Sequence, residues 1–282
     1  MKKLKAAVIQ LNSGSDKAKN LENASRLITK AAYRGAQLVA LPELFNWRGS
    51  KQEVKLNSES IPGPTLKRMA ELASSLKLFL LCGSIIETNA RSSKPYNTSF
   101  LLDPHGKCIA SYRKLHLFKA QLKGGDNIDE HQSYSTGGEV KTFTTSVGKV
   151  GLTICYDLRF PELYRAFAHD GAVVIFVPSA FTFETGKAHW EILLRARAIE
   201  NQVYLIAPNQ YGTDPLGNHA YGHSMIVDPW GTIIAQGSEG EGIIYGELDL
   251  EYLHRVREQL PSLKHLREDL FTTKANRLKK KS

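Results

Sequence analysis

Apolar and polar residues along the chain form two recurring patterns: short continuous apolar runs and longer runs in which apolar residues return every three or four positions. The first pattern is typical of buried β-strands and the second of amphipathic helices. Alternation of the two predicts an α/β fold. Strands are predicted over 4–11, 37–41, 78–86, 150–154, 172–177 and 202–208, and helices over 18–34, 65–76, 162–169, 187–201 and 250–260.

Two segments, 99–110 and 224–235, share one arrangement: an apolar strand, an Asp-Pro-x-Gly turn and a second apolar strand. The turns are Asp103-Pro104-His105-Gly106 and Asp228-Pro229-Trp230-Gly231. Asp, Pro and Gly at these positions favour a tight reversal, so both segments are predicted to be hairpins. Because each hairpin lies among βα units, we expect two similar halves in one domain over 1–272, with two facing mixed sheets and helices outside.

The composition is that of a globular protein, with 42% hydrophobic and 23% charged residues among 282. No apolar run reaches the roughly 18 residues that a membrane span needs, and the chain start has no cleavable apolar region. The three cysteines, Cys82, Cys108 and Cys155, are widely separated and offer neither a disulfide framework nor a four-cysteine zinc site. We therefore expect a cytoplasmic protein without a membrane partner, in which Cys82 and Cys108 are core residues.

The formal net charge of +9 is concentrated at the end of the chain. Five basic residues lie within the last nine, which leaves +4 for the remainder. The segment 273–282 is therefore predicted to be a flexible basic tail, and a solubilising role is favoured over a nucleic-acid-binding or membrane-binding arm. We expect no nucleic-acid partner.

Cys155 ends the apolar strand 150–154 and is followed by a polar turn in which Pro161 can begin a helix. A nucleophile at such a sharp junction is raised above the sheet edge, and the backbone N–H of Tyr156 can point at a developing oxyanion. Taken alone, a cysteine at the end of an apolar strand is more often a small core residue.

Three charged residues are further candidates for chemistry. Glu43 ends the apolar run 38–43, and the carboxyl end of such a strand is where α/β proteins usually bind ligands, although a helix cap or a solvated turn is an equal alternative. Lys114 lies in an apolar setting that could hold its ammonium against an oxyanion, or it is an ordinary strand-edge lysine. Glu130 lies in the polar, glycine-rich stretch 123–139, which by itself is typical of a surface loop.

Other classes of site lack their signatures. The nine histidines contain no His-Glu-x-x-His motif, and the segment between His219 and His223 is a poor helix, so no metal site is expected. No serine occupies a Gly-x-Ser-x-Gly elbow, and no glycine-rich loop follows the first strand. Serine-hydrolase and nucleotide-binding functions are therefore not indicated.

Three segments together resemble the nitrilase superfamily, whose Glu-Lys-Cys triad falls in this chain order: Leu-Pro-Glu43, Tyr-Arg-Lys114-Leu-His-Leu-Phe and Ile-Cys155-Tyr-Asp-Leu-Arg-Phe-Pro-Glu-Leu. The resemblance covers residues 4 to about 270 and extends through 178–182, 186–201 and 221–231. It implies a four-layer αββα sandwich, homodimers or higher oligomers in which the sandwiches stack, and no cofactor.

Within that superfamily the sequence is similar to the amidase branch that includes the Nit domain of NitFhit proteins, and most similar to deaminated glutathione amidases. ω-Amidases acting on α-ketoglutaramate or α-ketosuccinamate are the nearest alternative, but Pro178-Ser-Ala-Phe-Thr182 stands where they would carry Pro-Gly-Ala-Phe-Asn. The resemblance implies hydrolysis of a small carboxylate-bearing carboxamide to acid and ammonia through a cysteine thioester. A nitrile hydrolase with the same triad and a non-catalytic interaction protein are the remaining alternatives.

The triad would meet the chemical need of the reaction. A thiol with an ordinary pKa near 8.5 requires a base or a positive field to attack at neutral pH. Glu43 would take the Cys155 proton, Lys114 and the Tyr156 backbone N–H would hold the oxyanion, and Glu130 would orient Lys114.

The substrate-binding residues are expected near the nucleophile. Arg159 is the candidate clamp for a substrate carboxylate because a guanidinium can bind it in a bidentate fork. The alternative is a buried pair with a nearby acid such as Asp157 or Glu162. Phe45 and Phe181 are predicted to form walls of the pocket, with core aromatics as the equal alternative, and Thr182 lies beside Phe181.

Overall fold

The first strand runs through the middle of the molecule because both of its faces are apolar. The computed structural model describes residues 3–121, 127–267 and 270. Within β1 (Lys3–Gln10), Ala6 and Val8 point into one buried cluster, whereas Ala7 and Ile9 point into another. Because successive strand residues face opposite sides, a strand with this pattern is covered on both sides.

A mixed sheet of seven strands is built around β1. Its order is β17-β1-β2-β3-β5-β4, with β6 paired to β5. The pairs β1–β2 and β2–β3 are parallel and the others are antiparallel. The other six strands of this sheet are β2 (Leu38–Ala40), β3 (Phe79–Leu81), β4 (Ile85–Glu87), β5 (Tyr96–Leu102), β6 (Cys108–Arg113) and β17 (Gly242–Asp249).

A second mixed sheet has six strands in the order β16-β15-β12-β11-β10-β9. Its centre, β10 to β12, is parallel. Two small two-stranded sheets, β7–β8 and β13–β14, lie outside the main sheets. The bounds are β7 (Lys119–Gln121), β8 (Asn127–Asp129), β9 (Phe143–Thr145), β10 (Gly148–Leu152), β11 (Ala172–Phe176), β12 (Tyr204–Ala207), β13 (Tyr211–Thr213), β14 (His219–Tyr221), β15 (Met225–Val227) and β16 (Ile233–Gln236).

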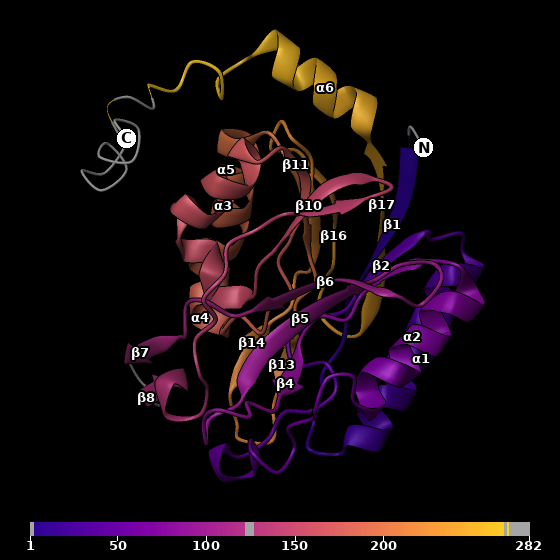
Figure 1. The fold of residues 1–282 in the computed structure, drawn as a ribbon, viewed down its shortest axis with the longest axis vertical. Helices are drawn as coiled ribbons and strands as arrows, with labels where there is room; N and C mark the ends of the chain where they lie inside the picture. Colours follow the sequence, from indigo (N-terminus) through magenta and orange to yellow (C-terminus); the bar gives the residue numbers. More distant parts are fainter. Residues whose placement is uncertain (1–2, 122–126, 268–269, 271–282) are drawn as a thin grey trace.

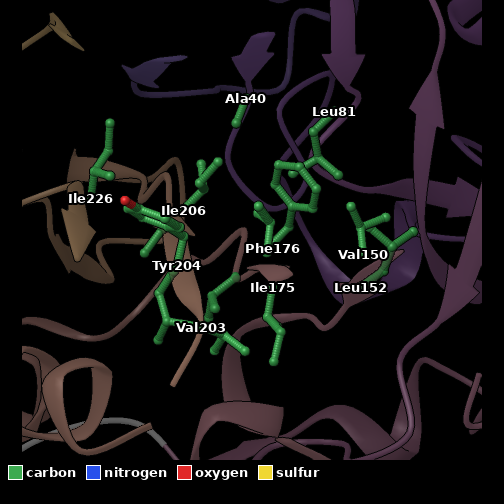
Figure 2. Close-up of a cluster of buried hydrophobic side chains, with 14 of the residues drawn as sticks. Ala40, Leu81, Val150, Leu152, Ile175, Phe176, Val203, Tyr204, Ile206 and Ile226 are labelled. Carbon is green, nitrogen blue, oxygen red and sulfur yellow. The ribbon is translucent and has the colours of Figure 1, made fainter. Parts of the chain in front are cut away.

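The two large sheets face each other across a continuous apolar layer. Figure 2 shows side chains from both sheets in this layer, with Ala40 and Leu81 from the first sheet and Phe176 and Ile206 from the second. All four are at most 1% exposed. Burial of this layer is the main force that holds the sheets together.

Helices cover the outer faces of the sandwich. Figure 1 shows α1 (Lys17–Tyr33) and α2 (Pro64–Leu76) on one side of the strands and α3 (Pro161–His169) and α5 (Glu191–Asn201) on the other, with α6 (Leu250–Gln259) at one end. The buried side chains of α1 share a cluster with the outward face of β1. The predicted four-layer αββα sandwich of two mixed sheets is therefore confirmed.

Both predicted hairpins are present, as β5–β6 and β15–β16. The predicted strand 78–86 is instead two strands, β3 and β4, separated by a break at Gly83, whose φ is +31°. A Cβ at Gly83 would lie 1.9 Å from the carbonyl oxygen of Pro42, so only glycine permits this close approach of the two segments. The break matters for the site because Pro42 precedes Glu43.

Three other expectations were incomplete or wrong. The predicted helix 187–201 begins earlier, as α4 (Phe183–Thr185) and a π-helical turn (Gly186–Trp190) that lead into α5. Strand β17 was missed because its residues are only half-buried. Cys108 is exposed, since it begins β6 beside the hairpin turn, whereas Cys82 is buried as expected. The predicted tail 273–282 lies outside the described residues.

Candidate active site

Cys155 lies on a tight turn just beyond the end of β10 in the second sheet. It begins the short 3₁₀ helix Cys155–Arg159 just after β10, and its φ of +49° lies in the left-handed region that non-glycine residues rarely adopt. Such a conformation costs about 1 to 3 kcal/mol. The backbone N–H of Cys155 donates to the carbonyl of Pro178 at 2.9 Å, which fixes the turn against the end of the neighbouring strand.

Asp157 fixes the same turn from inside. Its fully buried carboxylate accepts hydrogen bonds from the backbone N–H groups of Ile154 at 2.9 Å and His116 at 3.0 Å. It also accepts from the Tyr112 hydroxyl at 2.7 Å. Because His116 follows Lys114 by two residues, this single carboxylate ties the cysteine turn to the lysine segment.

Lys114 is a buried cation held between two carboxylates. Its Nζ lies 2.9 Å from Glu43 Oε1 and 2.8 Å from Glu130 Oε2, and the lysine side chain is 1% exposed. Burial alone would lower the pKa of Lys114, but the carboxylates of Glu130 and Glu43 outweigh it and raise that pKa well above its ordinary value. The ammonium therefore stays charged inside the protein.

Glu43 is positioned by hydrogen bonds to both of its carboxylate oxygens. Asn97 Nδ2 donates to Oε1 at 2.8 Å, and the backbone N–H of Ala180 donates to Oε2 at 2.9 Å. Gln210 Nε2 holds the Glu43 backbone carbonyl at 2.8 Å. The carboxylate is thus fixed between the two sheets rather than forming a cap or a solvated turn.

The Glu130 side chain is held beside Lys114 by hydrogen bonds with the backbone of Phe118. The Phe118 N–H donates to Glu130 Oε2 at 2.7 Å, and the Glu130 N–H donates back to the Phe118 carbonyl at 2.9 Å. Burial raises the pKa of Glu130, the nearby Glu43 carboxylate raises it further, and Lys114 opposes both effects. The glycine-rich stretch therefore carries an inward-facing acid at this residue, unlike a plain surface loop.

Cys155 as a whole is 9% exposed, and its thiol lies in the field of these charges. Burial raises the pKa of the thiol well above its ordinary value, the Glu43 carboxylate adds to the rise, and Lys114 opposes it. A raised pKa favours the neutral thiol, and a neutral thiol needs a base to remove its proton when it attacks.

Two cavities meet at Cys155. The larger, of about 390 Å³, is lined by Glu43, Glu130 and Cys155 together with an apolar wall. The smaller, a recess of about 20 Å³, contains four of the five predicted substrate-binding residues beside Cys155: Tyr156, Arg159, Phe181 and Thr182.

Phe45, the fifth predicted substrate-binding residue, lies elsewhere. Its side chain is fully buried in the cluster between the first sheet and its helices, and it lines neither cavity. The alternative of a core aromatic therefore holds for Phe45, because its side chain points to the helix side of the loop that carries Glu43.

Arg159 does not form the buried acid pair that was its alternative. Its guanidinium lies 5.3 Å from the ring centroid of Phe181 and 5.9 Å from that of Tyr156. Both terminal nitrogens lie 3.4 Å from His189 Nδ1. Within the described part of the chain no carboxylate pairs with Arg159, and Asp157 is engaged elsewhere, so its charge remains available to the recess.

Several lining residues of the larger cavity were not singled out from the sequence. Arg48 and Asp214 form a buried ion pair at 3.0 Å, and Trp47 and Tyr134 belong to the apolar wall. Only Trp47 and Arg48 had a usable signal, namely their closeness in the chain to Glu43. Asp214 and Tyr134 come from distant loops that the fold brings to the same place.

The described residues contain no group of three or more His, Cys, Asp or Glu side chains placed to hold a metal ion. Among the helices that the structure describes, none is long and apolar enough to cross a membrane.

Comparison with known proteins gives a family and curated relatives. The family model described as carbon-nitrogen hydrolase matches residues 5–258. A deaminated glutathione amidase from Synechocystis sp. is 41% identical over 268 residues, covering 94% of this chain and 98% of that protein. Omega-amidase NIT2 from Mus musculus is 39% identical over 277 residues, covering 98% of this chain and 100% of that protein.

Solved structures have the same fold. The C. elegans NitFhit protein superimposes with a TM-score of 0.91 at 38% identity, covering 96% of this chain and 67% of that one. A glutamate-to-glutamine variant of an amidase from Nesterenkonia sp. AN1, with acrylamide added at its active-site cysteine, has a TM-score of 0.77 at 26% identity. It covers 91% of this chain and 98% of that one.

Proposed function

The chain belongs to the carbon–nitrogen hydrolase family of the nitrilase superfamily, and from this we propose that it hydrolyses the amide of a small carboxylate-bearing acyl group through a thioester on Cys155. One observation carries the proposal: a buried lysine, Lys114, lies between the carboxylates of Glu43 and Glu130, and these two acids line a cavity together with the buried Cys155. An arrangement of this kind supplies a base, a fixed positive charge and a nucleophile.

In the first step Glu43 takes the proton from the Cys155 thiol while Sγ bonds to the amide carbon. The carbonyl π electrons move to oxygen, and the resulting oxyanion is held by Lys114 and the Tyr156 backbone N–H. The raised pKa of the thiol supports a base-assisted attack over one by a preformed thiolate. Glu130 acts as a positioning residue, because its hydrogen bond keeps Lys114 Nζ in place.

In the second step the tetrahedral intermediate collapses. The C–N bond breaks, Glu43 gives its proton to the departing nitrogen, and the acyl group remains on Cys155 as a thioester. Glu43 then takes a proton from water, whose oxygen attacks the thioester carbon. Cleavage of the C–S bond releases the acid and returns the proton to the thiol.

Two substrate types follow from the names of the relatives. Deaminated glutathione and ω-amides of α-keto acids present a similar acyl group, but deaminated glutathione releases cysteinylglycine whereas an ω-amide releases ammonia. Deaminated glutathione is our leading substrate, because Glu43 lines the larger cavity and that cavity has room for a substituted leaving group. An ω-amide is the second candidate, supported by the NIT2 relative at 39% identity.

The test is a panel of deaminated glutathione, α-ketoglutaramate, glutamine and simple nitriles, with acid, amine and ammonia release followed separately. We expect the wild type to cleave at least one of the first two and Cys155→Ala to cleave none. Cys108→Ala is the matched control, because this exposed cysteine lies outside both cavities. A nitrile preference would identify a nitrile hydrolase, and inactivity on the whole panel would favour a non-catalytic interaction protein.

We further propose that the protein forms homodimers through the face of α5. Ile192 on α5 is 68% exposed, and Trp230 in the turn between β15 and β16 is 54% exposed. Arg195 Nε on α5 donates to the Gly231 carbonyl at 2.9 Å, so the helix and this turn adjoin. Exposed apolar side chains that adjoin one another are typical of a contact between protein chains, and this adjacency supports the proposal. Light scattering of wild type and Ile192→Glu tests this, with a shift toward monomer expected in the variant.

A cytoplasmic location is the corresponding proposal for the compartment. A catalytic thiol needs reducing conditions, and all three cysteines are free. Cell fractionation tests it, and recovery in an oxidising compartment would argue against it.

A further inference from the structure

Arg48 is a buried cation in the wall of the larger cavity, on the same loop as Glu43. Its side chain is 10% exposed, and its guanidinium Nη2 donates to Asp214 Oδ2 at 3.0 Å. Asp214 is itself fully engaged, because its Oδ1 accepts the backbone N–H groups of Leu216 and Asn218, both at 2.9 Å. The ion pair therefore fixes where the guanidinium lies.

The other terminal nitrogen, Nη1, is buried and has no hydrogen-bond partner among the described residues. An unsatisfied donor on a buried charged group is unfavourable, and native structures rarely keep one without a reason. Burial lowers the pKa of Arg48, and the carboxylates of Asp214 and Glu43 oppose that effect. A guanidinium stays protonated at any physiological pH, so Arg48 places a permanent positive charge in the cavity lining, and its unpaired Nη1 is buried beneath that surface.

The two cavities differ in which part of a substrate they can hold. Glu43 lines the larger cavity but is absent from the lining of the recess. Because Glu43 delivers the proton to the departing nitrogen, that nitrogen and its substituents must lie on the side of the larger cavity. The recess, of about 20 Å³, has room only for the end of the acyl chain beside Arg159, whereas the leaving group extends through the larger cavity toward Arg48.

We propose that Arg48 binds a carboxylate on the leaving amine, so that the enzyme selects amides whose nitrogen carries an acidic substituent such as a C-terminal amino acid. This inference rests on the proposed function. The apolar wall around Trp47, Val54 and Tyr134 would accept the uncharged part of the same leaving group. Arg48 would then recognise the leaving-group end of a dicarboxylate amide, and Arg159 the acyl end.

The competing explanation is that Arg48 only anchors the turn that carries Asp214. A matched set of substrates separates the two roles: deaminated glutathione, its glycyl methyl ester, and α-ketoglutaramate, whose leaving group is ammonia. Release of α-ketoglutarate reports on all three. Arg48→Met is compared with wild type and with Lys51→Met, which removes an exposed cation from the lining of the same cavity.

We expect Arg48→Met to reduce kcat/KM for deaminated glutathione by about 10- to 100-fold, mainly through KM, because a charge-assisted hydrogen bond is lost. The ester and α-ketoglutaramate should change less than about threefold, and Lys51→Met should resemble wild type on all three. Arg48→Lys should recover part of the loss, since it restores the charge.

Several results would overturn the proposal. Equal losses on all three substrates would assign Arg48 a purely structural role, and an equal effect of Lys51→Met would indicate only the general field of the cavity. If the wild type does not prefer deaminated glutathione over its ester, the proposed contact with the leaving-group carboxylate is rejected, whereas the proposed amidase activity is not affected.

A binding measurement separates this inference from the proposed function. Calorimetry of deaminated glutathione with Cys155→Ala, and with Cys155→Ala/Arg48→Met, measures the contact without turnover. If the double variant binds deaminated glutathione at least tenfold more weakly than Cys155→Ala, the Arg48 contact is supported. If the wild type also cleaves no amide, the same result supports the contact but rejects the proposed hydrolase. Equal affinities would reject the contact whatever the activity.

Discussion

Replacing Lys114 with methionine removes one charge at the centre of the site while keeping most of the side-chain volume. In the wild type its Nζ bonds to Glu43 at 2.9 Å and to Glu130 at 2.8 Å, and the two carboxylate side chains are 3% and 18% exposed. Methionine leaves these two acids close together with no cation between them. The substitution should therefore affect both catalysis and stability.

The two effects have different sizes. Loss of one donor to the oxyanion costs about 10²- to 10³-fold in kcat, or roughly 3 to 4 kcal/mol in the barrier. Removal of one partner from a buried ion pair costs about 3 to 5 kcal/mol in the free energy of unfolding. Unfolding and turnover must therefore be measured separately, since a partly unfolded sample would imitate a catalytic defect.

The stability loss should depend on pH. Burial already raises the pKa of Glu130, and without Lys114 only the hydrogen bond from the Phe118 N–H opposes that rise. A carboxyl whose folded pKa is raised imposes no penalty below its unfolded pKa, near 4.3, because it is protonated in both states. Stability is lost as the pH rises through the folded value, so Lys114→Met should be less destabilised at pH 5 than at pH 8.

Denaturant unfolding at both pH values, together with single-turnover assays on the folded variant, measures these effects. Lys114→Met/Glu130→Gln should regain part of the stability at pH 8 but none of the turnover. Lys149→Met, which breaks an exposed pair with Asp170, is the control and should change neither property appreciably. Turnover within tenfold of wild type, or a stability loss of the same size at both pH values, would refute this account of Lys114.

Other substitutions test the supporting contacts. Asp157→Asn should lower the free energy of unfolding by about 1 to 3 kcal/mol and reduce kcat, because a fully buried acceptor of two backbone N–H groups becomes partly a donor. Denaturant unfolding and steady-state kinetics would detect the two changes. Glu130→Gln should reduce kcat by roughly 10- to 100-fold with little change in KM, since it weakens a charge-assisted hydrogen bond to Lys114; unchanged kcat would remove its positioning role. Glu43→Gln should abolish turnover and lower the pKa of the Cys155 thiol, because a nearby negative charge is lost. Thiolate absorbance as a function of pH, measured against Cys155→Ala, reports this pKa, and a higher pKa in the variant would contradict the account.

The layers of the fold could be predicted because hydrophobic periodicity records which faces are buried. Strand β1 and helix α1 each show a pattern that admits one kind of element. Strand β17 could not be recognised in this way, because half-buried residues give no clear alternation. The break at Gly83 was also hidden, since its cause is the distant Pro42 carbonyl rather than the local sequence.

The candidate site was predictable where a residue's role is local and hidden where it depends on distant partners. Cys155 ends a strand, which marked it as a candidate from its neighbours alone. The sequence suggested Asp157 only as an alternative partner of Arg159, and its support of the turn depends on His116 and Tyr112, which the fold brings to it. Arg48 gave no signal beyond its place near Glu43, because Asp214 is 166 residues away in the chain.

The central claim is that Cys155 carries the acyl group during turnover, and a trapped intermediate tests it most directly. Acid quenching of wild type with deaminated glutathione in the pre-steady state, followed by peptide mass mapping, should locate an α-ketoglutaryl thioester on Cys155. It should form within the first turnover and be absent from Glu43→Gln. Product release at the full rate with no acyl adduct on Cys155, or with the adduct on another residue, would contradict the account.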